Sequence, residues 1–196
     1  MVSSGVKTPR LRLLTPVLNE WISVVTRVTE AWQNEDVPFW YNERAQVGLF
    51  AGAVWLQGGL ALEEYTSTKR GSAGRCDLWF EMKRNSFIAE AKFTRCPVNT
   101  DSDVRPFLTG QFKKAKDDAR RNKVWGKNEH RIALLFVAVE VSADAKIEPS
   151  LTKWRRQFET VEADGRAWVF PTVNREFRSG KEGNFYPGCG VLVAKV

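Results

Sequence analysis

The sequence predicts one α/β domain in which helices flank a central mixed sheet. Three observations carry this expectation: two strand-like arms around a polar break within residues 75–93, helical stripes of apolar residues on either side of that hairpin, and an almost unbroken apolar run at 132–139. A hairpin pairs its arms antiparallel, whereas a strand reached through a helix pairs parallel, so the sheet should be mixed. A chain of 196 residues has the length of one compact domain.

Composition and charge narrow the class of protein. The formal net charge of +7 favours an anionic partner such as nucleic acid. The three cysteines are scattered and odd in number, which favours a reduced, cytoplasmic setting without a disulfide framework. We recognise no signal peptide and no run of about 18 apolar residues, so we expect no membrane span.

The first part of the chain, residues 1–38, is expected to form an arm and a packing helix. Residues 1–14 show no periodicity and should be flexible. Thr15 and Pro16 are typical of a helix start. One helical stripe of apolar residues then follows, formed by Leu18, Trp21, Ile22, Val25, Val28 and Trp32.

A second helix is expected over residues 39–57, ended by Gly58 and Gly59. Its inward stripe carries Glu43 one turn before the apolar residues. A carboxylate near a helix start can simply favour the helix dipole, and a role in a site is the alternative.

A strand at 60–68 and a basic loop at 69–75 should follow. Glu64 shares its face with Leu60 and Leu62, which makes it a better site candidate than Glu63, although both could be exposed edge residues. Glycines let a backbone approach phosphate closely, and the cations of the loop suit that ligand; an ordinary turn is the alternative. The candidate phosphate contacts are Lys69, Arg70 and Arg75.

The hairpin pairs an arm at 75–82 with an arm at 86–93. A tight turn centred on Arg84 and Asn85 would place Leu78 near Ala91 and, one pair further, Asp77 near Lys92. Because side chains alternate between faces, Asp77, Glu90 and Lys92 are then expected on one face of the sheet.

Two acids and a lysine on one face need a physical reason, because burying charge is costly unless it is paired or binds an ion. Mg²⁺ is usually held by one or two carboxylates plus phosphate oxygens, which Asp77 and Glu90 could supply. Lys92 could orient an attacking water or stabilise developing negative charge.

At these positions the chain resembles the PD-(D/E)xK nuclease superfamily, which has the restriction-endonuclease-like fold. The matching residues are Asp77, twelve intervening residues, then Glu90, Ala91 and Lys92, while Cys76 stands where the family usually has proline. The resemblance covers roughly residues 40–141. It implies an αβββαβ core and hydrolysis of phosphodiester bonds, with DNA as the expected substrate and Mg²⁺, or Mn²⁺ in its place, as the cofactor.

The resemblance also implies a role for each site residue. Asp77 and Glu90 would bind the metal, with the carbonyl of Ala91 as a further ligand, and Lys92 would assist the attacking water. Two further site residues are implied by their places in the resembled fold, Glu43 on the helix before the sheet and Gln111 on the helix after the hairpin.

That later helix is expected from Val104 or Pro106 to Asn122, followed by a strand at 131–141 buried on both faces and reached by a parallel crossover. A helix at 148–161 and short strands at 167–170 and 190–196 complete the chain. Between these strands, residues 174–188 should form a mobile, substrate-facing loop that offers Arg175 and Arg178 to nucleic acid.

The domain is thus expected to comprise residues 1–38, a core at 39–141 and a C-terminal part at 142–196. Three alternatives stay open: a nucleic-acid-binding or regulatory module without catalysis, a nuclease directed at RNA, and an unrelated α/β protein in which the three charged residues form a salt-bridge cluster. The oligomeric state also stays open, with a homodimer among the possibilities.

Overall fold

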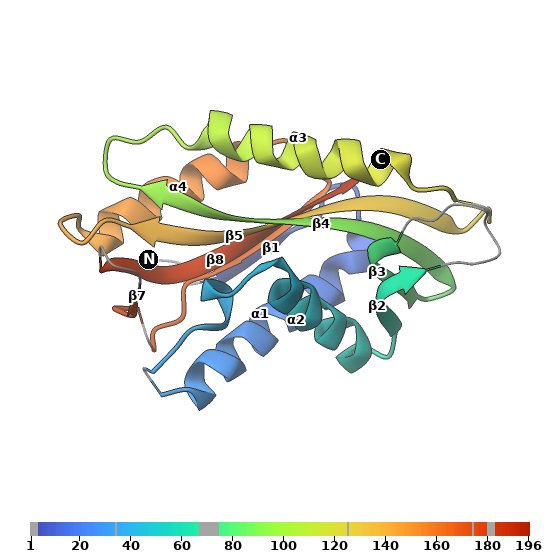
Figure 1. Ribbon diagram of the computed structural model, residues 1–196, viewed down its shortest axis with the longest axis horizontal. Coiled ribbons are helices and arrows are strands. Elements are labelled where there is room, and N and C mark those ends of the chain that lie inside the picture. The colour runs from blue at the N-terminus through green and yellow to red at the C-terminus, as the bar shows by residue number, and fades with distance from the viewer. Residues whose placement is uncertain (1–3, 34, 67–74, 125, 174, 180–182) are drawn as a thin grey trace.

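The protein is a mixed β-sheet between two layers of helices (Figure 1). The computed structural model describes residues 4–33, 35–66, 75–124, 126–173, 175–179 and 183–196. Its elements in chain order are β1 (Ser4–Lys7), α1 (Thr15–Ala31), α2 (Glu43–Leu56), β2 (Leu60–Thr66), β3 (Arg75–Met82), β4 (Asn85–Val98), α3 (Arg105–Arg121), β5 (Glu129–Val141), α4 (Ile147–Thr160), β6 (Gly165–Val169), β7 (Arg178–Ser179) and β8 (Asn184–Lys195). Two short 3-10 turns lie at Arg12–Leu14 and Pro38–Trp40.

The strand order is β1-β6-β8-β5-β4-β3-β2, and β7 adds to β8. Strands β4 and β5 run parallel and are joined through α3, as the apolar run at 132–139 predicted. The other strand pairs within the described residues are antiparallel, so the sheet is mixed. Within the described residues no helix is both long and apolar enough to cross a membrane.

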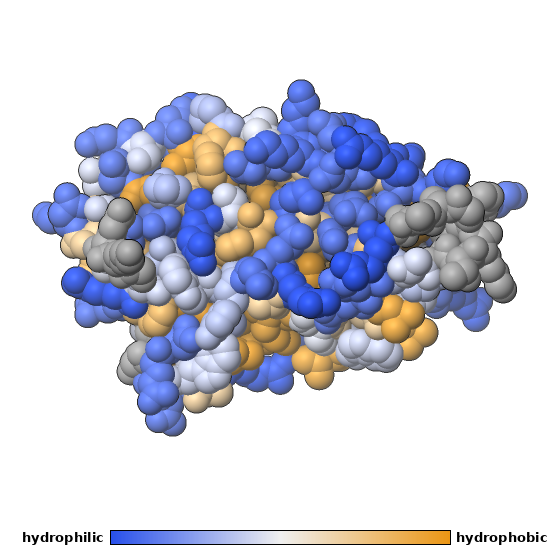
Figure 2. Space-filling model, in the orientation of Figure 1, coloured by the Kyte–Doolittle hydropathy of each residue, from blue (hydrophilic) through white to orange (hydrophobic). Residues whose placement is uncertain are grey.

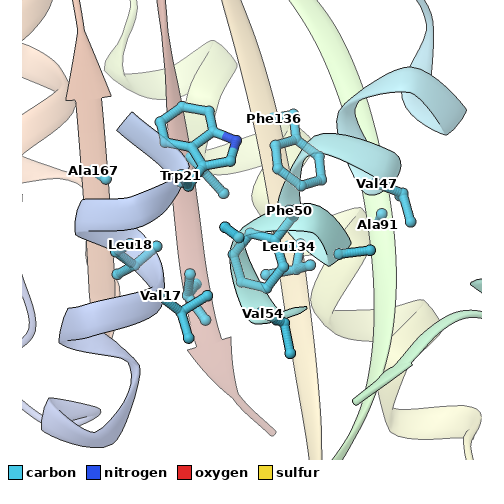
Figure 3. Packing of buried hydrophobic residues seen from close by; sticks show 14 of the residues in the cluster. Val17, Leu18, Trp21, Val47, Phe50, Val54, Ala91, Leu134, Phe136 and Ala167 are labelled. Atoms are coloured by element: carbon cyan, nitrogen blue, oxygen red, sulfur yellow. The ribbon is translucent and has the colours of Figure 1, made fainter. Parts of the chain in front are cut away.

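Two apolar cores fill the space between the sheet and its helices. Helices α1 and α2 cover one face, where the rings of Trp21 and Phe50 pack against Phe136 of β5 with centroids 6.5 and 6.2 Å away (Figure 3). Helices α3 and α4 cover the other face, where Phe112 and Trp154 are buried against β5. Strand β5 contributes to both cores, so its apolar run is buried on both faces as expected.

The N-terminal part departs from expectation in two places. Residues 4–7, expected as part of a flexible arm, form strand β1 and pair with β6 through Gly5 and Trp168. The second helix begins at Glu43 rather than at residue 39, because Asn42 caps it by accepting a hydrogen bond from the Ala45 N–H at 3.2 Å.

The hairpin forms, but its turn lies one residue earlier than expected. Met82 pairs with Asn85, so the turn consists of Lys83 and Arg84, both with positive φ (48° and 64°). A two-residue turn with both φ positive matches the right-handed twist of the strands. Leu78 therefore faces Ala89 rather than Ala91.

The observed register differs from the expected one by two residues, so the same side chains still share a face of the sheet. The next pair in this register brings Asp77 opposite Glu90, not opposite Lys92. Strand β4 also extends to Val98, beyond the arm expected to end at residue 93, because it continues to pair with β5.

The C-terminal strands are longer than expected as well. The last strand, β8, begins at Asn184 and pairs with β5 and β6 on its two sides. The expected loop at 174–188 is thus partly strand: β7 and the first residues of β8 form a small antiparallel pair.

Candidate functional site

The site lies where strand β3 separates from strand β4. The two strands pair from Met82 and Asn85 up to Leu78 and Ala89, after which β4 continues beside β5. Asp77 is the first residue beyond the last pair. Its Oδ2 accepts a hydrogen bond from the backbone N–H of Ala91 at 2.8 Å, so the carboxylate takes the place of a strand partner.

Glu90 lies beside Asp77 and is half-buried. Asn122, the residue that follows α3, donates a hydrogen bond from its side-chain amide to Glu90 Oε1 at 2.8 Å. The pKa of Glu90 is raised to about 7, mainly by burial and also by the charge of Asp77 and a hydrogen bond with Asp77. The hydrogen bond from Asn122 and the charge of Lys92 lower this pKa in part. The two carboxylates are therefore close enough to share a proton or a cation.

Lys92 follows on the same face of β4 and pairs with α3. Its Nζ lies 3.1 Å from the Asp118 Oδ2. Burial lowers the pKa of Lys92, but the hydrogen bond to Asp118 and the charges of Glu43, Asp118 and Asp77 outweigh it and raise this pKa above its ordinary value. Lys92 is held as a cation, which suits the stabilisation of negative charge and not the removal of a proton.

Glu43 joins the same group of charges from the first turn of α2. The pKa of Glu43 is raised above its ordinary value, mainly by burial and also by the charge of Asp77. The charge of Lys92 and a hydrogen bond from the Phe93 backbone lower it in part. These interactions bring together the four carboxylates and amines that the sequence placed in one site: Asp77, Glu90, Lys92 and Glu43.

Of the two glutamates on β2, Glu64 was the better candidate, and the structure ties it to arginines. Its carboxylate lies 3.0 Å from Arg44 Nη2 and also pairs with Arg75. Glu64 adopts a φ of 55°, an uncommon conformation for a residue other than glycine. Glu63 and Glu64 both line a small hollow of about 50 Å³ that Glu43 and Asp77 share, so both lie at the rim of the site.

The remaining candidates divide into three groups. Gln111 lies two helical turns, about 10 Å, before Asp118 on α3, so the contacts of that helix with the site come from Asp118 and Asn122 instead. Lys69 and Arg70 lie outside the described residues. Arg75 is at the rim, paired with Glu64 as described above.

Arg175 and Arg178, the two nucleic-acid contacts expected within residues 174–188, lie far along the sheet from the carboxylates. The strand pairs locate Arg178 relative to Glu90 along β5. Arg178 of β7 lies opposite Phe185 of β8, which lies opposite Val141 of β5. Glu90 of β4 lies opposite Ala133 of β5. Eight residues along β5 separate those two pairs, roughly 26 Å.

The Arg175 guanidinium is held within the fold. It pairs with Glu148 at the start of α4, and its Nη2 donates to the Phe170 carbonyl at 3.1 Å. The segment is therefore anchored at Arg175 and is partly strand, while its expected contact with substrate stays a prediction.

Sequence reasoning missed Asp118 and Asn122. Asp118 lies in the last turns of α3, and Asn122 is the residue that ends it. The signal was present: each follows a small buried residue by three positions, Asp118 after Ala115 and Asn122 after Ala119, and these alanines allow the helix to approach the sheet. In the sequence they were hidden within a run of charged residues.

The donor set fits a hard divalent cation. Asp77 and Glu90 each have one oxygen fixed by an N–H donor, and their carboxylates interact with one another. Among the described residues no group of three or more histidine, cysteine or carboxylate side chains is placed to hold a metal. Two carboxylates are enough for Mg²⁺ when phosphate oxygens and water complete its shell.

Comparison with known proteins adds no relative. No model of a known protein family matches the chain, and no curated protein matches it in sequence.

Proposed function

We propose that the protein is a metal-dependent nuclease that hydrolyses phosphodiester bonds, with DNA as the expected substrate. The observation that carries the proposal is the fork between β3 and β4, where the interacting carboxylates of Asp77 and Glu90 lie beside the cation Lys92. Charges are rarely gathered at a half-buried place unless they pair or bind an ion. Here the carboxylates of Asp77 and Glu90 lie side by side, and a bound cation would offset the repulsion between them.

The order of elements supports the same proposal. Helix α2, the meander β2-β3-β4, helix α3 and the parallel strand β5 follow one another as in the αβββαβ core of the restriction-endonuclease-like fold. The carboxylates and the lysine lie on the central strands of that series, in agreement with the resemblance of Asp77, Glu90 and Lys92 to the PD-(D/E)xK motif.

In the proposed reaction Asp77 and Glu90 would hold Mg²⁺ or Mn²⁺, with the Ala91 carbonyl as a further ligand. The cation, when bound, supplies polarisation of the phosphate and a more acidic water. Lys92 stabilises negative charge on the attacking water or the phosphate oxygens. Asp118 and Asn122 fix the Lys92 ammonium and the Glu90 carboxylate, so the reactive groups are oriented before substrate arrives.

The experiment is a cleavage assay on plasmid, linear and single-stranded DNA and on RNA, each with Mg²⁺, Mn²⁺ or chelator. We expect cleavage with metal and none with chelator. Asp77→Asn should lose both rate and metal affinity, because an amide is a poorer ligand for Mg²⁺ than a carboxylate. Lys92→Ala should still bind metal while its rate falls by roughly a hundredfold or more.

A matched control is available on β3. Glu81→Gln changes a carboxylate on the same face of the same strand, two pleats from Asp77, and should leave the rate unchanged. A Lys92→Ala protein that cuts at the parental rate would overturn the mechanism. Cleavage of RNA alone would replace DNA as the substrate, and binding of nucleic acid without any cleavage would favour a non-catalytic module.

A further inference from the structure

A basic hollow opens next to the carboxylate pair, at the C-terminal end of α3. It has a volume of about 360 Å³. Its lining is cationic apart from one amide and one apolar side chain: Arg120, Arg121, Asn122, Lys123, Val124 and Arg131. Figure 2 shows hydrophilic side chains gathered over α3, the helix whose last turn supplies Arg120 and Arg121.

Two of these cations are neutralised by their own helix. Arg120 Nη1 lies 2.6 Å from Asp117, and Arg121 Nη1 lies 3.2 Å from Asp118. In the parts of the chain that the structure describes, Lys123 and Arg131 form no such pair with a carboxylate. The hollow therefore keeps a net positive charge.

Arg131 is fixed in position by the end of the helix. Its Nη1 donates to the Arg120 carbonyl at 3.0 Å and is 3.5 Å from the Asn122 carbonyl. The guanidinium keeps its Nε and Nη2 donors, and a planar guanidinium that is already ordered loses little entropy when it binds phosphate. Cations in the last helical turn also favour the helix dipole, which accounts for Arg120 and Arg121. It does not account for Lys123, which lies beyond the helix, or for Arg131, which comes from β5.

Asn122 connects the hollow to the candidate active site. It lines the hollow, and its side-chain amide donates to Glu90 at 2.8 Å. A nucleic-acid strand whose scissile phosphate lies on Asp77 and Glu90 would thus carry its neighbouring phosphate to the hollow. Each phosphate that a protein neutralises adds affinity that depends on salt.

We propose that this hollow binds the backbone phosphate next to the scissile one and so sets the register of the strand. The inference rests on the proposed nuclease function. It adds a phosphate subsite to the two carboxylates and assigns it to Lys123 and Arg131, with Arg120 at its rim.

The test uses oligonucleotides with 5′-hydroxyl ends, so that every phosphate is internal. One natural phosphodiester is flanked on its 5′ side, its 3′ side or both sides by methylphosphonate linkages, which carry no charge. Cleavage is read from product length with Mg²⁺, and equilibrium binding of the same oligonucleotides is measured in chelator. The hollow variant is Lys123→Gln with Arg131→Gln, and the control is Lys113→Gln with Lys114→Gln, which removes the same charge from exposed positions of α3.

We expect the parental protein to lose about tenfold in kcat/KM and in affinity when one particular neighbour is uncharged, because the hollow then loses its hydrogen bond to a charged oxygen. The hollow variant should lose that sensitivity, and the control should retain it. The slope of log affinity against log salt should also fall in the hollow variant, by about 0.7–0.9 for one phosphate contact.

The two proposals fail in different ways. If metal supports no cleavage of any substrate, the nuclease proposal fails, and the binding series in chelator still decides whether the hollow recognises a phosphate. If cleavage occurs but the hollow variant and the parental protein respond equally to every methylphosphonate, the subsite is overturned while the nuclease proposal stands. Equal loss of affinity in the hollow and control variants overturns it too, because only the overall charge would then matter.

Discussion

The Lys92 ammonium and the Asp118 carboxylate lie 3.1 Å apart, which links the middle of the sheet to the helix that follows it in the chain. About a third of each side chain is exposed, 34% for Lys92 and 32% for Asp118. The pair is thus accessible to solvent, while the ion pair fixes the direction of the Lys92 side chain. This geometry suits a role that depends on the orientation of the Lys92 ammonium and not only on its charge.

Asp118→Asn should lower the rate without removing metal binding. The amide keeps an oxygen for Lys92 but loses the charge that orders the ammonium, so we expect kcat to fall about tenfold at saturating substrate, less than in Lys92→Ala. Asp117→Asn is the control, because Asp117 pairs with Arg120 instead. Isothermal titration of metal and a kcat measurement on both variants check this; equal rates for the two would show that Asp118 does not position Lys92.

Lys92→Ala should leave stability nearly unchanged. A partly exposed ion pair contributes about 0–1 kcal/mol, so the variant should unfold within about 1 kcal/mol of the parental protein. Urea unfolding measures this difference. A loss of about 3–5 kcal/mol would instead indicate a buried salt-bridge cluster with a structural role.

Glu90→Gln should change how stability depends on pH. The folded protein holds the Glu90 proton up to a pKa of about 7, whereas the unfolded chain releases it near 4.5. Between these values the folded state binds more protons, so this carboxyl stabilises the fold at low pH and the contribution is lost as pH rises through 7.

A glutamine side chain does not titrate, so its contribution to stability does not change with pH. After allowance for solvent screening, we expect Glu90→Gln to gain about 1–2 kcal/mol on the parental protein between pH 5 and pH 8 in chelator. Chemical unfolding at both pH values provides the measurement, with Glu81→Gln as the control. A stability difference that does not vary with pH would show that Glu90 titrates as an ordinary carboxyl.

Metal affinity should rise with pH across the same range. A cation competes with the proton on Glu90, so below a pKa of about 7 the affinity should rise up to about tenfold per pH unit, and above it should level off. Calorimetry at pH 6 in buffers of different ionisation enthalpy should detect up to one proton released per cation. Affinity that stays constant from pH 5.5 to pH 8 would argue against Glu90 as a ligand.

The hairpin turn offers a separate test of the register. Lys83 and Arg84 both adopt positive φ, which asparagine and glycine accept more readily. Replacing them together by Asn-Gly should stabilise the protein by about 0.5–1 kcal/mol. Placing Asn-Gly at Arg84 and Asn85, the turn first expected, should destabilise it because the register would have to shift. Thermal melts of the two variants decide between the registers.

The hairpin and the parallel crossover could be predicted because their signals are local. Alternation in the arms fixes which face each side chain occupies, and a shift of two residues preserves that face, so Asp77 and Glu90 share it despite the wrong turn. The turn itself was missed because Lys83 and Arg84 are not residues that favour positive φ.

Contacts between distant elements could not be predicted in this way. Asn122 reaches Glu90 across 32 residues of sequence, and the direction in which α3 crosses the sheet decides that contact. The same holds for β1, since Ser4–Lys7 is a strand only because β6 is there to pair with it. Arg175 and Arg178 were expected to contact nucleic acid on the basis of charge alone, and charge carries no information about which end of the sheet a residue occupies.

The separation of β3 from β4 has a consequence for self-association. Beyond Ala89 the β3 side of β4 is an open strand edge, which in other proteins can recruit a strand from a second molecule. Here the Asp77 and Glu43 carboxylates accept the N–H groups of Ala91 and Phe93, and Pro97 has no N–H to offer. The Asp77 and Glu43 carboxylates thus also occupy backbone donors of β4 that could otherwise pair with a strand of another chain. Asp77→Ala would remove a proposed metal ligand and the acceptor of the Ala91 N–H together, whereas Asp77→Asn keeps an acceptor for Ala91.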